Sequence, residues 1–153
     1  RALERLQKEG TCRSIGVSNF LPHHLDDLLE DAEIVPSVDQ VEFHPRLQSP
    51  ELQKYLREKG IWLEAWTPIM KGQVLDIPEL VEIGKAHDKS AVQVTLRWEL
   101  QKNIITIPKS VHKERIESNA DIFDFELSDE EMKKIDTLDR DKRTGAHPDH
   151  FDF

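Results

Sequence analysis

The chain has 153 residues, which is enough for one domain with a hydrophobic core. It carries 30 acidic and 21 basic residues, and this excess of acid argues against a general binder of nucleic-acid phosphates. No run of 18 apolar residues occurs, so no membrane span is predicted, and the single Cys12 has no partner for an internal disulfide, which suits a cytoplasmic protein.

The first predicted element is a helix that is already under way when the sequence opens. Residues 2–9 have a helical pattern that ends at Gly10, and neither a cap nor a strand precedes them. We therefore expect the natural N-terminus to lie upstream of Arg1.

Four short apolar runs then alternate with helical patterns. The runs predict strands over 14–20, 36–43, 61–66 and 103–108. The helical patterns cover 22–33, 50–59, 78–87, 90–102 and 128–138. Ser49 is predicted as an N-cap, Gly60 as a helix stop, and Ser128 with Glu131 as a capping box.

Strand and helix alternating at steps of roughly 25 residues predict an α/β fold with a parallel sheet. Four such units make either half of an eight-fold barrel or a small doubly wound sheet, and the pattern leaves both open. A half barrel would expose two unpaired strand edges. No linker divides the chain, so residues 1–153 are predicted to be one unit.

Polar residues follow the predicted strands, at the end where a barrel places its working face. They are Ser18 and Asn19, Gln40, Trp66 and Thr67, and Lys109 and Ser110. Ser, Asn and Gln both donate and accept hydrogen bonds and so suit a carboxamide, and Trp66 offers a flat face for an aromatic ring. Turn chemistry at Ser18-Asn19 and simple core packing of Trp66 are the alternatives.

A basic cluster follows the last predicted strand. Lys109, Ser110 and Arg115 combine two cations and a hydroxyl near the start of a helix. Such a set suits a phosphate monoester, although a solvated run of charges would have the same sequence.

Four motifs in register resemble the second half of the aldo-keto reductases. They are GVSNF (16–20), DQVEFHP (39–45), AWTP (65–68) and IPKS (107–110). The segments 123–128 and 143–148 resemble the microbial, diketogluconate-reductase-like branch of that family. The resemblance implies a (β/α)8 TIM barrel of which only strands five to eight are present, and NADPH binding without a GxGxxG motif.

The resemblance also implies roles for individual residues. Ser18, Asn19 and Gln40 would hold the nicotinamide carboxamide, and Trp66, followed by Thr67, would stack on the ring. The 2′-phosphate and adenine would fall to the residues after the last strand, namely Lys109, Ser110, Arg115 and Asn119. Ser118 stands where many members have Glu, and His112 fills a variable position.

The family's catalytic Tyr, Asp, Lys and His come from strands that have no counterpart here. The only tyrosine, Tyr55, has the setting of an outer-helix residue, so we expect no catalytic residue in this chain. The tail, residues 140–153, is predicted to shape the substrate pocket through His147 and Phe151, with a frayed terminus as the alternative. The spacing of its acids and histidines fits no metal site.

The resulting expectation is an NADPH-dependent oxidoreductase that reduces aldehydes or ketones to alcohols. The intact enzyme is expected to be a monomer, and the isolated half is expected to be inactive and able to self-associate through its strand edges. The alternative is a non-catalytic, cofactor-sensing or interaction protein on the same barrel, as in the potassium-channel β subunits that resemble aldo-keto reductases.

Overall fold

The structure, a computed structural model, describes residues 1–150, so the predicted substrate residue Phe151 lies outside the described residues. Its strands are β1 (Val17–Ser18), β2 (Val38–Glu42), β3 (Trp62–Trp66) and β4 (Ile105–Thr106). Its α-helices are α1 (Ala2–Lys8), α2 (Pro22–Asp31), α3 (Pro50–Lys59), α4 (Pro78–His87), α5 (Ala91–Gln101), α6 (Lys113–Ala120) and α7 (Asp129–Asp136). Two 3-10 helices, η1 (Met70–Asp76) and η2 (Pro148–His150), complete the fold.

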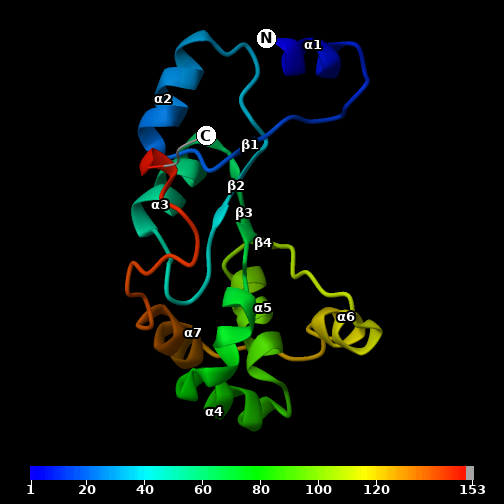
Figure 1. Ribbon diagram of the computed structural model, residues 1–153, viewed down its shortest axis with the longest axis vertical. Coiled ribbons are helices and arrows are strands. Elements are labelled where there is room, and N and C mark those ends of the chain that lie inside the picture. Colours follow the sequence, from blue (N-terminus) through cyan, green and yellow to red (C-terminus); the bar gives the residue numbers. More distant parts are fainter. Residues whose placement is uncertain (151–153) are drawn as a thin grey trace.

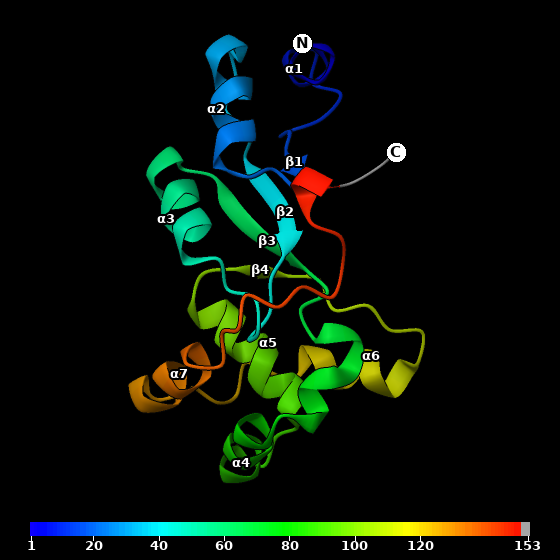
Figure 2. The same ribbon diagram turned by 60° about the vertical axis from the view of Figure 1, so that its left-hand side comes forward.

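The four strands form one parallel sheet in the order β1-β2-β3-β4 (Figure 1). Each strand pairs with the next one along the chain, and α2 and α3 lie along the same side of the sheet (Figure 2). A doubly wound sheet reverses its strand order and carries helices on both faces, whereas a barrel keeps the order sequential. The sequence left these two open, and the sheet has the order of a barrel segment.

The two faces of the sheet differ in their surroundings. Asp39 and Val41 of β2 point to the helix side and are buried, as is Ala65 of β3. The alternate residues Gln40 and Glu64 share the opposite face, where the register places them side by side. Large apolar side chains remain exposed outside this packed layer, at Trp62, Ile105 and Ile107.

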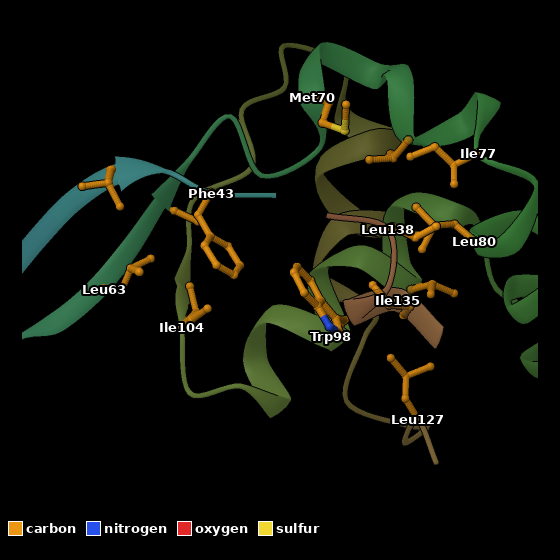
Figure 3. Close-up of a cluster of buried hydrophobic side chains, with 14 of the residues drawn as sticks. Phe43, Leu63, Met70, Ile77, Leu80, Trp98, Ile104, Leu127, Ile135 and Leu138 are labelled. Atoms are coloured by element: carbon orange, nitrogen blue, oxygen red, sulfur yellow. The ribbon is translucent and has the colours of Figure 1, made fainter. Parts of the chain in front are cut away.

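The hydrophobic core lies between the sheet and the C-terminal helices (Figure 3). Trp98 of α5 stacks on Phe43 with a ring-centroid distance of 5.3 Å and lies next to Ile135 of α7. Its indole nitrogen donates to Asp136 at 2.9 Å, so this large ring buries its apolar surface and still satisfies its polar atom. The core therefore fixes α5 and α7 against the end of β2.

Most predicted helix boundaries hold to within two residues. The Ser128–Glu131 capping box is present, and Gly60 ends α3 with a φ of 71°. The prediction for Ser49 was wrong in its mechanism, because Ser49 has a left-handed backbone with a φ of 45° and makes no side-chain cap. Pro50 instead begins α3, since its fixed φ suits the first helical position.

The segment after β3 was not predicted to be helical. It forms the 3-10 helix η1, interrupted by left-handed residues at Lys71 and Gly72. Among the described residues, none of the helices combines the length and apolar character needed to cross a membrane.

Candidate functional site

The ends of β1 and β2 are tied together by hydrogen bonds to one backbone carbonyl. The Ser18 hydroxyl donates to the Gln40 carbonyl oxygen at 3.0 Å, and the Asn19 amide donates to the same oxygen at 2.9 Å. Asn19 has a left-handed backbone, with a φ of 60°, which a short polar side chain tolerates. Three of the residues predicted for the carboxamide therefore lie together, on adjacent strand ends.

Trp66 joins this group from the end of β3. Its indole nitrogen donates to Asn19 Oδ1 at 3.0 Å. Thr67 follows with a left-handed backbone, and its carbonyl accepts from the Met70 amide at the start of η1. A cleft of about 590 Å³ opens here, and its walls include Ser18, Asn19, Trp66 and, from the tail, Ala146 and Pro148.

The internal hydrogen bonds leave a defined set of polar atoms for a ligand. Trp66 can only donate, so Asn19 turns its oxygen to the indole, and within residues 1–150 its Nδ2 donor has no partner. Gln40 Nε2 donates to Glu64 Oε1 at 2.6 Å, which leaves Gln40 Oε1 as an acceptor. One donor and one acceptor, with the Ser18 hydroxyl beside them, match the carbonyl and amino groups of a carboxamide.

A buried acid that the sequence analysis did not single out holds the part of the tail that leads into the cleft wall at Ala146. Glu42, the last residue of β2, is buried and accepts hydrogen bonds from both the amide and the hydroxyl of Thr144, from Gly145 and from His44. Burial by itself would raise the pKa of Glu42, but these hydrogen bonds together hold the pKa below its usual value. No local pattern signals this contact, because Thr144 lies 102 residues further along the chain.

His44 is a structural partner of Glu42. Its side chain is fully buried, and its Nε2 lies 3.1 Å from Glu42 Oε1. Burial lowers the pKa of His44, so at neutral pH the ring is uncharged and donates one hydrogen bond to the carboxylate.

The predicted phosphate residues lie apart from this group. Lys109 and Ser110 follow β4, and Arg115 and Asn119 are on α6, which no buried residue anchors (Figure 1). Ser110 forms a local turn by accepting from the His112 amide at 3.2 Å. Lys109 and Arg115 are exposed, and within residues 1–150 neither forms an ion pair.

Tyr55 lies on α3, away from the strand ends. Its hydroxyl donates to Asp26 of α2 at 2.5 Å and so links two outer helices. Burial and the hydrogen bond to Asp26 raise the pKa of Tyr55 to about 12, which is unsuited to proton donation near neutral pH. This agrees with the expectation that Tyr55 packs an outer helix.

Two histidines of α2 meet the tail. His23 and His24 each place Nε2 near Asp149 Oδ1, at 3.0 and 3.1 Å, and these groups come within reach of one metal ion. However, His24 Nδ1 accepts from the Leu21 amide at 3.0 Å, which places the proton of a neutral ring on Nε2. A metal ligand nitrogen must be unprotonated, so the arrangement is that of a hydrogen-bonded clasp. His147 turns its Nδ1 to the Asp149 amide.

Comparison with known proteins gives the class of this fold and site. The model of the Aldo/keto reductase family matches residues 1–140. The chain belongs to this family, and the α/β fold with a parallel sheet covers part of its barrel.

Similar curated proteins include the glyoxal reductase of Bacillus subtilis (strain 168), which is 58% identical over 153 residues, 100% of this chain and 55% of that protein. The 9,11-endoperoxide prostaglandin H2 reductase of Trypanosoma cruzi (strain CL Brener) is 46% identical over 99% of this chain and 54% of that protein. The chain therefore spans about half the length of the curated relatives it matches.

Solved structures agree with this assignment. The aldo-keto reductase MGS-M4 from a Medee basin deep-sea metagenome library superposes with a TM-score of 0.97 at 42% identity, over 100% of this chain and 58% of that one. A Gox0644 mutant in complex with NADPH has a TM-score of 0.96 at 40% identity, over 99% of this chain and 56% of that one.

Proposed function

We propose that this chain forms the cofactor-binding part of an NADPH-dependent oxidoreductase that reduces aldehydes or ketones to alcohols. In this proposal the four strands are the fifth to eighth of the barrel. The single observation that carries it is the set of free polar atoms on Ser18, Asn19 and Gln40 beside the indole of Trp66. The NADPH complex of Gox0644 and the relative that is a glyoxal reductase support the same cofactor and a carbonyl substrate.

Each residue has a defined task in this proposal. Asn19 Nδ2 donates to the carboxamide oxygen, and Gln40 Oε1 and Ser18 Oγ accept from the carboxamide nitrogen, which sets the face of the ring that meets the substrate. Trp66 supports the ring and excludes water from it, with Thr67 next to it. NADPH supplies the hydride, and the proton comes from a group outside this chain.

The cofactor preference is assigned to the segment after β4. Lys109, Ser110 and Arg115 bind the 2′-phosphate that distinguishes NADPH from NADH, and Asn119 contacts the adenine. The exposure of Lys109 and Arg115 and the absence of an ion pair for either within residues 1–150 leave both cations available for a phosphate. Ala146 and Pro148 of the tail line the cleft, and in this proposal the tail, including His147, shapes its substrate side.

The test compares two cofactors in the full-length protein. Lys109→Met and Arg115→Ala should each weaken NADPH binding by roughly 10- to 100-fold and leave NADH binding nearly unchanged, because a charge-assisted hydrogen bond contributes about 1.5–3 kcal/mol. Dissociation constants from fluorescence titration measure both. Lys54→Met, an exposed lysine paired with Glu58 on α3, is the matched control and should change neither. Equal losses for NADPH and NADH would contradict the phosphate assignment.

A further inference from the structure

We propose that Glu42 is a positioning residue: it holds the tail segment 143–145 against the edge of Trp66 and thereby fixes the indole ring at the cofactor cleft. This inference rests on the proposed function in one respect, namely that the cleft binds the cofactor. The contact itself, between a strand end and the tail, stands on geometry that does not depend on which ligand the cleft binds.

The carboxylate of Glu42 anchors the tail. One carboxylate oxygen of Glu42 accepts from the Thr144 amide at 2.5 Å and from its hydroxyl at 2.6 Å, and the other accepts from the Gly145 amide at 3.2 Å. Arg143 Nη1 lies 3.9 Å from the same carboxylate. Three donors from two consecutive residues converge on one acid whose side chain is fully buried, and charge-assisted bonds of this kind are short and directional.

Gly145 of the tail approaches Trp66 closely. A Cβ atom placed on Gly145 would lie 2.5 Å from Trp66 Cη2 and 3.4 Å from Cζ2. The tail backbone therefore lies so close to the indole that a side chain at position 145 would displace the ring. The Trp66 indole nitrogen is held by Asn19 at the same time. The ring is therefore fixed at two places, by a hydrogen bond to Asn19 and by the tail backbone.

Other contacts also hold the tail in place. The amides of Arg140 and Lys142 donate to the Arg46 carbonyl, and Asp149 meets His23 and His24 of α2. These contacts flank segment 143–145 on both sides, as the tail crosses the ends of the strands (Figure 2). Loss of the Glu42 contact should therefore loosen this segment locally and leave the rest of the tail attached.

The substitutions follow from the acceptor geometry. Glu42→Gln keeps the size of the side chain but turns an NH2 group toward N–H donors, so at least one tail donor loses its acceptor. Gly145→Ala leaves the anchor intact and moves the ring directly. Glu99→Gln is the matched control, because Glu99 is also a fully buried acid but belongs to α5 and has no hydrogen-bond partner, in the tail or elsewhere, within residues 1–150.

The primary measurement is tryptophan fluorescence of the ligand-free, full-length protein. Subtracting the spectrum of each variant's Trp66→Phe counterpart isolates the emission of Trp66 from that of Trp62 and Trp98. Glu42→Gln and Gly145→Ala should shift this emission to the red and increase its quenching by acrylamide, and Glu99→Gln should not. Unchanged Trp66 emission in Glu42→Gln would overturn the proposal, whatever Gly145→Ala shows. Should Glu42→Gln fail to fold, Thr144→Val tests the same contact.

A second measurement separates this inference from the proposed function. If Trp66 supports the nicotinamide ring, Gly145→Ala should also raise the dissociation constant for NADPH by roughly 2- to 12-fold, since contacts of an aromatic ring contribute about 0.5–1.5 kcal/mol. Thr144→Ser, which keeps the hydroxyl, should leave both signals as they are in the unmodified protein. A shift of the Trp66 emission in Glu42→Gln, with unchanged NADPH binding in both Glu42→Gln and Gly145→Ala, would uphold the positioning by Glu42 and contradict the cofactor role of Trp66.

Discussion

Glu42 and Glu99 are both fully buried carboxyl groups, but they lie in different regions of the molecule and differ in their partners. Glu42, at the cleft, accepts four hydrogen bonds, and its pKa is held below the usual value. Glu99, on α5 behind the sheet, has no hydrogen-bond partner for either oxygen within residues 1–150. Burial raises the pKa of Glu99 well above its usual value and so favours the neutral form of this side chain.

Asp39, on the helix side of β2, lies between these extremes. Its Oδ1 accepts from the Phe20 amide at 3.4 Å, while Oδ2 is buried without a partner among the described residues. Burial raises its pKa to about 7, against the opposing effect of the Phe20 amide. The comparison indicates that the number of converging donors, and not depth alone, decides whether a buried acid in this fold carries charge.

Removal of the satisfied acid should have the largest effect. Glu42→Met keeps the volume but leaves the tail donors without an acceptor, and we expect a loss of about 3 kcal/mol in the free energy of unfolding. Chemical denaturation of the full-length protein at pH 7 measures it. The stabilisation by Glu42 is present above the pKa of the unfolded chain and is lost as the pH falls through the lowered folded pKa. A loss below about 1 kcal/mol would show that the tail contributes little.

Asp39→Asn should have an effect of similar size, and with the opposite pH dependence. Because the folded pKa is raised from 3.8 to about 7, the folded state binds the proton more tightly, and stability falls as the pH rises between these values. The variant cannot ionise, so its advantage over the unmodified protein should grow by roughly 3–4 kcal/mol from pH 4 to pH 8. Unfolding free energies at both pH values test this, and a constant difference would contradict the raised pKa.

Replacement of Glu99, the acid without a hydrogen-bond partner within residues 1–150, should have the smallest effect on the free energy of unfolding, and it should stabilise the protein where Glu42→Met destabilises it. Glu99→Met removes two unpaired oxygens at similar volume, and we expect a gain of about 1 kcal/mol in the free energy of unfolding at pH 7. Glu99→Gln is the control and should change stability by less than about 0.5 kcal/mol, because the raised pKa of Glu99 favours the neutral acid, which Gln matches in size and charge. Destabilisation by Glu99→Met would mean that this acid has a partner. Thr106 faces it, although not in hydrogen-bonding geometry.

The sequence predicts much of this fold because its signals are local. Apolar runs followed by helical periodicity indicate four strands and their helices, and Ser128 and Gly60 mark helix ends through backbone chemistry within a few residues. Functional groups lie at the carboxyl ends of parallel strands, and this rule is enough to expect Ser18, Gln40 and Trp66 near one another from the sequence alone.

Other features depend on contacts that no local pattern carries. The helix η1 contains left-handed residues at Lys71 and at Gly72, and Ser49 is left-handed where a capping serine was predicted. The role of Glu42 in holding the tail is visible only once the structure brings the Thr144 and Gly145 donors to its carboxylate. The roles of Lys109, Ser110, Arg115 and Asn119 stay predictions, because they concern a ligand and not the fold.

The long reach of the Glu42–Thr144 contact also bears on the order in which the molecule assembles. Within the sheet, the contacts Ser18–Gln40 and Gln40–Glu64 join residues that are 22 and 24 positions apart in the sequence. The contact between Glu42 and the tail closes a loop of 102 residues. The chain entropy lost in closing the longer loop is greater by about 1 kcal/mol, and the contact gains nothing until β2 is in place. The sheet should therefore form first, and the wall of the cleft beside Trp66 should be the last part to dock and the first to open.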